Sequence, residues 1–197
     1  MKPLIDLFVD LPTWPMIRSL GIASYLMLGI GICLGILYSW PNQLPKRKLF
    51  RYKLHTFFTV GGTAVGMLHG VITVIDTYMP FDWSEVLVPF TAKHEPLLNG
   101  LGTLTVYGLL ILIFTSDIRN KLKKKLWYAI HLFSYPIFAM AFVHGYFIGT
   151  DTSNEAIRWT YFATLIAVLG LTVARGIVRS APDKKRLASR GTSSSAR

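Results

Sequence analysis

Five long apolar runs are the feature that most constrains the fold of this chain. They cover about residues 20–40, 54–75, 97–115, 126–148 and 159–178. Each approaches the roughly 20 apolar residues that cross the hydrocarbon of a bilayer. In lipid, every backbone donor and acceptor needs a partner within the protein, so such runs form helices. The sequence therefore predicts an all-α integral membrane protein built as a bundle of five transmembrane helices.

The composition agrees with a membrane protein. Of 197 residues, 52% are hydrophobic and only 16% are charged, which is more apolar than an ordinary soluble domain. The formal net charge is +11. Because long apolar runs separate the basic residues, we expect them to meet anionic lipid headgroups and no nucleic acid. The single cysteine, Cys33, excludes an intramolecular disulfide and a Cys-ligated iron–sulfur cluster.

The distribution of charge predicts the orientation in the membrane. Most of the 21 Lys and Arg residues lie in the connections 41–53 and 116–125 and after residue 174, whereas the other connections carry most of the acidic residues. Loops rich in Lys and Arg stay in the cytoplasm. We therefore expect a multi-pass protein of the cell membrane, with its N-terminus outside and its C-terminus in the cytoplasm.

Three regions are expected along the chain. Residues 1–19 are predicted to form an outer interfacial segment, and residues 20–178 carry the transmembrane domain. Residues 179–197 are rich in serine and basic residues, so a disordered cytoplasmic tail is expected. The long connection 76–96, with its aromatic residues and prolines, is expected to fold back onto the outer face of the membrane.

Four histidines lie within the second and fourth apolar runs. Ionisable side chains inside a membrane are costly and usually serve a function. His55 and His69 are 14 residues apart, and His131 and His144 are 13 residues apart, about 20 Å along a helix axis in each case. Both runs start at the cytoplasmic side, so depth pairs His55 with His131 on the inner side and His69 with His144 on the outer side.

The chemistry of such pairs favours haem over other metals. Neutral imidazole ligates haem iron, zinc and copper. Each pair supplies two protein ligands, fewer than the four of a structural zinc site, whereas two axial imidazoles suit an electron-transfer haem. The alternative is a set of histidines that hydrogen-bond between helices. His94, in the outer loop, is interpreted as a surface residue, with a role at an outer substrate site as the alternative.

Helix geometry adds two expectations about these sites. Gly62 and Gly66 fall on the face that carries His55 and His69, so we expect them to make room for flat ligands. An ideal helix would turn His144 about 220° away from His131. A proline between them, Pro136, is expected to kink or rewind the helix.

The histidine spacings and the segment KKKLWYAIHLFSYPIFAMAFVHGY resemble the ferric reductase-like transmembrane domain family. This family includes the membrane halves of NADPH oxidases and ferric-chelate reductases. The haem-binding membrane subunit of the periplasmic methionine sulfoxide reductase is a relative. Lys123–Lys125 and Trp127 match the basic patch and aromatic residue that precede the histidine in the family. The resemblance covers about residues 20–178.

The resemblance implies two b-type haems that carry electrons from a cytoplasmic donor to an outer acceptor. His55 and His131 would hold the inner haem, and His69 and His144 the outer one. Full-length members commonly have six helices with the histidines on the third and fifth, whereas here they lie on the second and fourth. The family's flavin and nicotinamide module is not found after Val178. We therefore expect a separate cytoplasmic flavoprotein, or quinol, as donor.

Three functions are consistent with these residues. The first is an oxidoreductase, ferric reductase-like, that delivers electrons directly to a ferric chelate or oxygen. The second is a non-enzymatic haem-binding subunit that passes electrons to a periplasmic or extracellular partner reductase. The third is a metal-binding transporter or scaffold without haem. Arg51 and Lys53 are candidates to pair with the propionates of an inner haem, and Arg18 with those of an outer one.

Overall fold

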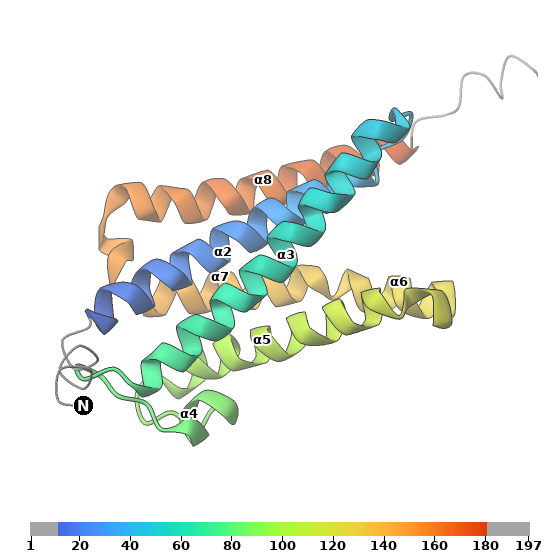
Figure 1. Ribbon diagram of the computed structural model, residues 1–197. Helices are drawn as coiled ribbons and strands as arrows, with labels where there is room; N and C mark the ends of the chain where they lie inside the picture. The colour runs from blue at the N-terminus through green and yellow to red at the C-terminus, as the bar shows by residue number, and fades with distance from the viewer. Residues whose placement is uncertain (1–11, 181–197) are drawn as a thin grey trace, which may run out of the picture.

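The computed structural model describes residues 12–180, which form helices and no strand (Figure 1). The elements in chain order are α2 (Thr13–Tyr38), α3 (Pro45–Val74), α4 (Trp83–Leu87), α5 (Pro96–Asp117), η1 (Arg119–Lys121), α6 (Lys124–Leu132), α7 (Ser134–Ile148), η2 (Thr150–Ser153) and α8 (Glu155–Ser180). Five spans are long and apolar enough to cross a membrane: α2, α3, α5, α6 with α7, and α8. The prediction of an all-α protein with five such helices is confirmed.

Two helices begin well before the apolar runs that reveal them. α2 begins at Thr13 and α3 at Pro45. Pro45 occupies the first turn of α3, where its missing N–H costs nothing, and the Lys and Arg residues that follow are good helix formers. Hydropathy thus marks the apolar part of a helix and not its end. The segment predicted for residues 1–19 overlaps α2, and residues 1–11 and 181–197 lie outside the described residues.

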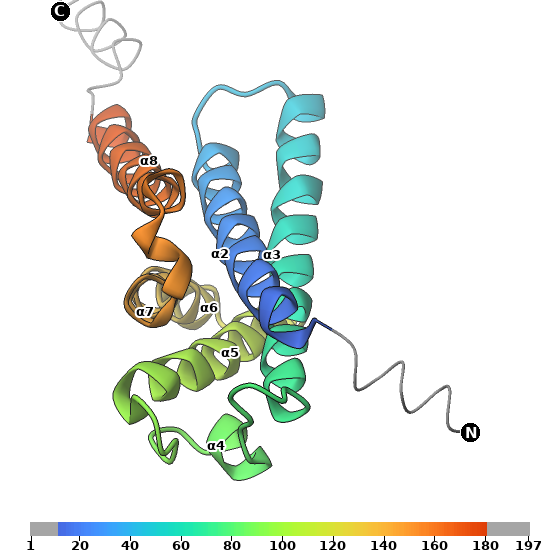
Figure 2. The same cartoon turned by 90° about the vertical axis from the view of Figure 1, so that its left-hand side faces the viewer.

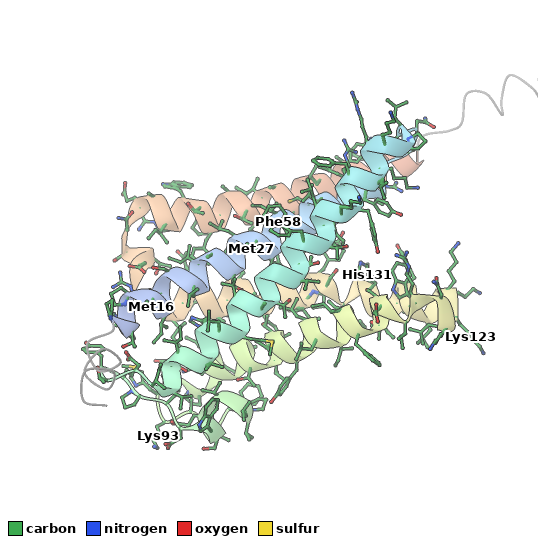
Figure 3. The ribbon with its side chains drawn as sticks, in the orientation of Figure 1. Met16, Met27, Phe58, Lys93, Lys123 and His131 are labelled. Carbon is green, nitrogen blue, oxygen red and sulfur yellow. The ribbon has the colours of Figure 1, made fainter. Side chains whose placement is uncertain are left out.

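The bundle has two chemically different ends. The end that we call the basic end holds the α2–α3 connection and the turn from α5 to α6. The α4 end holds α4 and the connection from α7 to α8. Figure 3 shows Lys123 at the basic end and Met16 and Lys93 at the α4 end. In Figure 1, α3 and α6 diverge towards the basic end.

Helix pairs and one aromatic cluster form the core. α2 packs along α3, α5 packs along α7, and α8 packs against α2 (Figure 2). The buried Tyr25 of α2 stacks on Phe138 of α7 and on Tyr161 of α8, with ring centroids 5.2 and 4.4 Å apart. The Tyr25 hydroxyl donates to the Tyr161 carbonyl at 3.2 Å. This cluster packs α2 against α7 and α8, and Leu109 of α5 lies against it.

The outer faces of the helices are apolar and exposed. Phe57 on α3 is 65% exposed, and Ile166 and Ile177 on α8 are 65% and 67% exposed. An exposed apolar surface of this extent around helices of such length is what hydrocarbon contact requires. The described residues therefore present the surface of a multi-pass membrane protein.

The connection containing α4 is a small folded unit. The Asp82 and Glu85 side chains form a capping box at the start of α4. The buried Glu85 carboxylate accepts hydrogen bonds from the backbone N–H groups of Asp82 at 2.8 Å and Lys93 at 2.7 Å. These two bonds stabilise the ionised form and lower the pKa of Glu85 from its ordinary value. α4 contacts α3 and α5, so the connection folds across the ends of both helices.

Candidate functional site: two histidine pairs

The four intramembrane histidines form two close pairs. His55 and His131 have ring centroids 6.2 Å apart with planes inclined at 70°. His69 and His144 also have ring centroids 6.2 Å apart, with planes inclined at 80°. The first pair lies nearer the basic end, with His131 on α6 (Figure 3), and the second lies nearer the α4 end. These are the partners that depth along the helices predicts.

A break in the fourth span lets both of its histidines face α3. α6 ends at Leu132 and α7 begins at Ser134. Pro136 has no N–H with which to reach the Leu132 carbonyl, four residues before it. The chain instead closes a tighter turn, in which the Phe133 N–H donates to the Ile130 carbonyl at 3.0 Å. His131 and His144 thus lie on two separate helices, so the 220° expected for one ideal helix does not apply.

Three of the four rings are held by a backbone carbonyl of a neighbouring helix. Nδ1 lies 2.7 Å from the Gly31 carbonyl in His55, 2.8 Å from the Ile17 carbonyl in His69, and 2.8 Å from the Leu98 carbonyl in His144. A carbonyl only accepts, so Nδ1 must carry the proton in all three. A neutral ring with its proton on Nδ1 leaves the Nε2 lone pair available for a metal.

A glycine lies four residues after each of these carbonyls, one helical turn further on. A Cβ added at Gly35 would lie 3.0 Å from the His55 ring, and one at Gly21 would lie 3.2 Å from the His69 ring. At Gly102 it would lie 2.8 Å from the His144 ring. Each ring therefore occupies a recess on α2 or α5, in which the carbonyl holds Nδ1 and the glycine leaves room for the imidazole.

The structure corrects the role expected of two other glycines. A Cβ at Gly62 would meet Met27 and Leu28 of α2, and one at Gly66 would lie 2.8 Å from Ser24 Oγ. Ser24 Oγ also donates to the Gly62 carbonyl at 2.8 Å. The expectation that these glycines make room for flat ligands was wrong. They allow α2 and α3 to approach closely, the usual role of small residues between membrane helices.

His131 differs from the other three histidines. Its Nδ1 is buried without a hydrogen-bond partner, as is Nε1 of Trp127, and among residues 12–180 no other buried side-chain nitrogen or oxygen is left unpaired. The two rings stack, with centroids 5.0 Å apart and planes 20° apart. His131 is thus positioned by an aromatic neighbour instead of a carbonyl. Buried polar atoms without partners are uncommon in native proteins, and an ordered water or ion is a usual partner.

The donor set of each pair fits a metal held in a macrocycle. Two imidazoles that ligate one ion from opposite sides, each about 2 Å from it, place their ring centroids roughly 6 Å apart, close to the 6.2 Å of both pairs. No group of three or more His, Cys, Asp or Glu residues within the described range converges on a metal site. Each pair therefore brings together two imidazoles.

Other candidate residues are engaged elsewhere or exposed. Arg18 forms an ion pair with Asp151 of η2. Arg51 donates to the Leu37 carbonyl at 3.0 Å and to Gln43 Oε1 at 2.7 Å, which links α3 to the end of α2. Lys53 and His94 are exposed. The contacts of Arg18 and Arg51 hold helix ends together, a role that the sequence did not reveal.

Comparison of the chain with protein-family models, with curated protein sequences and with solved structures finds no match.

Proposed function

We propose that this chain is a transmembrane electron conduit that binds two b-type haems, one at each histidine pair. The observation that carries the proposal is the repeated geometry of the pairs. Both have ring centroids 6.2 Å apart, and three of the four rings donate Nδ1–H to a backbone carbonyl. Hydrogen bonds between helices account for the position of three single rings, but they do not require the rings to meet in two pairs with the same separation.

The chain's own residues do three things for such a cofactor. The carbonyls of Gly31, Ile17 and Leu98 fix the tautomer and orientation of three rings and increase their basicity as ligands. The glycine recesses hold the rings against α2 and α5. Histidine ligation and the polarity of the surroundings would set the reduction potential of a bound haem. A bound haem supplies reversible one-electron chemistry at the iron.

The two sites are arranged in series across the membrane. The histidines of α3 are 14 residues apart, about 21 Å along the axis. By the distribution of Lys and Arg, the basic end faces the cytoplasm, so His55 and His131 would hold the haem nearer the donor, and His69 and His144 would hold the one nearer the acceptor. Movement of one electron outwards along an inside-negative potential is favourable by about 2.3 kcal/mol per 100 mV. The donor proposed is a cytoplasmic flavoprotein or quinol, and the acceptor is a ferric chelate, oxygen or a partner reductase.

Electron transfer through proteoliposomes tests the proposal. The haem-loaded chain is reconstituted in vesicles that enclose dithionite, and reduction of membrane-impermeant external ferricyanide is followed. We expect transfer by the wild type and its loss in both His55→Ala and His69→Ala, because sites in series fail together. His94→Ala is the matched control, since His94 is exposed and belongs to neither pair. Equal transfer by the wild type and by either single-site variant would contradict the proposal.

The same preparation identifies the class of electron acceptor. The reduced protein is mixed with ferric citrate or with oxygen, and the return of the oxidised spectrum is timed. Rapid reoxidation identifies a terminal reductase, whereas slow reoxidation identifies a subunit that needs a partner protein. A chain that binds no haem at all and instead binds a divalent metal would be a transporter or scaffold.

A further inference from the structure

A pocket at the basic end has no part in the histidine pairs. It has a volume of about 370 Å³ and lies where α2 ends and α3 begins, with one wall from η1. Its lining residues are Tyr38, Pro45, Lys48, Leu49, Tyr52 and Arg119. The pocket thus combines two cations and two tyrosines with an apolar surface of proline and leucine.

Each of the two cations, which belong to exposed residues, lies over one of the two aromatic rings. Lys48 Nζ lies 5.2 Å from the centroid of the Tyr38 ring, and Arg119 Cζ lies 5.4 Å from the centroid of the Tyr52 ring. The rings themselves are 5.7 Å apart. Such contacts orient a cation but do not neutralise it. None of the ion pairs within residues 12–180 involves Lys48 or Arg119, so two uncompensated positive charges flank the pocket.

The position of the pocket indicates the class of ligand that it binds. It lies at the ends of two spans that are long and apolar enough to cross a membrane, and therefore at the depth of lipid headgroups. We propose that the pocket binds the phosphate of an anionic phospholipid. Arg119 and Lys48 contact the phosphate oxygens, the two tyrosine hydroxyls donate to the headgroup, and Leu49 and Pro45 contact the glycerol and the first acyl carbons.

A lipid at this place lies close to one histidine pair. Lys48 precedes His55 by seven residues, which puts it on nearly the same face of α3 and about 10.5 Å away along the axis. A bound phosphate therefore adds negative charge on the basic-end side of the His55–His131 pair. Binding itself depends only on the pocket and does not rest on the proposed function.

Native mass spectrometry of the purified chain tests the proposal. Phosphatidylglycerol and phosphatidylcholine are titrated against the wild type, the double variant Lys48→Gln/Arg119→Gln, and a control, Lys46→Gln/Lys121→Gln. The control removes the same charge from exposed residues of the same end that do not line the pocket. Circular dichroism verifies that all three proteins are equally helical.

We expect the wild type to prefer phosphatidylglycerol and the control to keep that preference. The pocket variant should bind it roughly 25-fold more weakly, about fivefold for each basic residue lost near an anionic headgroup. Equal losses in the two variants would show diffuse attraction without a site and would overturn the proposal. Displacement of phosphatidylglycerol by excess inorganic phosphate would identify a soluble phosphate ligand and would overturn it as well.

Discussion

At the scale of single residues, the histidine rings are held by very few atoms. Each of three rings contacts one carbonyl and one glycine that are a helical turn apart on a neighbouring helix. The carbonyl and the glycine act together, because the ring reaches the oxygen only where no Cβ stands in its way. How well each site holds its histidine ring therefore depends on a glycine of the neighbouring helix.

Gly102→Ala should damage the site at the α4 end. The added Cβ would lie 2.8 Å from His144 Cε1 and 2.9 Å from Nδ1, so the ring must move away from the Leu98 carbonyl. Overpacking of this kind costs about 1–3 kcal/mol, and we expect haem affinity at that site to fall roughly tenfold or more. A haem titration measures the change.

Gly170→Ala is the matched control for this substitution. Nothing lies within 4 Å of a Cβ at Gly170, so the same chemical change meets no neighbour there. We expect wild-type haem binding and a slightly more stable helix, by up to about 1 kcal/mol. If the two glycine variants bind haem equally, the recess around His144 has no role.

Trp127 should decide how firmly His131 is held. Trp127→Phe keeps an aromatic ring beside His131, whereas Trp127→Leu removes the stacking, which is worth about 0.5–1.5 kcal/mol. We expect haem loss to a scavenger protein to be fastest from the His55–His131 site, and faster still in Trp127→Leu than in Trp127→Phe. The two phases are assigned with His131→Ala and His144→Ala. A faster loss from the His69–His144 site would show that the missing carbonyl at His131 is unimportant.

At the scale of elements, the α6–α7 break and the α4 connection each have an identifiable local cause. The break before Pro136 frees His131 and His144 from the register of one helix, so both meet α3. The α4 connection is folded by the Glu85 carboxylate, which joins Asp82 at the start of α4 to Lys93 beyond its end. At the α6–α7 break, Pro136 cannot donate a backbone hydrogen bond, and the chain forms a tighter turn. In the α4 connection, the buried Glu85 carboxylate accepts hydrogen bonds from two backbone N–H groups.

The stability of the α4 connection should depend on pH through Glu85. Its folded-state pKa is below the ordinary value of 4.5, so its contribution is fully present above that value and is lost as the pH falls through the folded pKa. We expect amide hydrogen exchange of residues 82–93 to rise several-fold in acid, after correction for the intrinsic rate. Glu85→Gln should show raised exchange already at neutral pH. Exchange that does not change between neutral and acid pH would exclude this role.

The sequence predicts some of these elements better than others. The depth of His55, His69, His131 and His144 follows from counting along two apolar runs, and the structure places these residues in the expected pairs. Which residue a glycine faces depends on how helices that are distant in the sequence pack together. Gly62 meets α2 instead of a ligand, and Gly102 reaches His144 from a different helix. Apolar helices also lack the polar face from which such packing is read in soluble proteins.

At the scale of the whole molecule, five spans leave the start of α2 and the end of α8 at opposite ends of the bundle (Figure 1). The basic end gathers the α2–α3 connection, η1 and the last turns of α8, whereas the α4 end gathers Asp76, Asp82, Glu85 and Asp151. The rule that basic loops stay in the cytoplasm gives this asymmetry a direction. Under the proposed function, this direction would put the His55–His131 pair nearer the donor.

Cysteine labelling in intact cells measures the orientation. Cys33 is first replaced by alanine, and single cysteines are then placed in two exposed turns, Ser153→Cys in η2 and Asn120→Cys in η1. We expect a membrane-impermeant maleimide to label Ser153→Cys in intact cells and Asn120→Cys only after permeabilisation. The reverse pattern would invert the proposed direction of electron flow.

The haem content of the purified chain tests the central claim most directly. Reduced-minus-oxidised absorption spectra, calibrated against protein concentration, should give two b-type haems per wild-type chain. We expect one haem per chain in His55→Ala or His144→Ala, none in the double variant, and two in the exposed-histidine control His94→Ala. A wild-type chain without reducible b-type bands, or a haem content that does not change when His55 and His144 are replaced, would contradict the account.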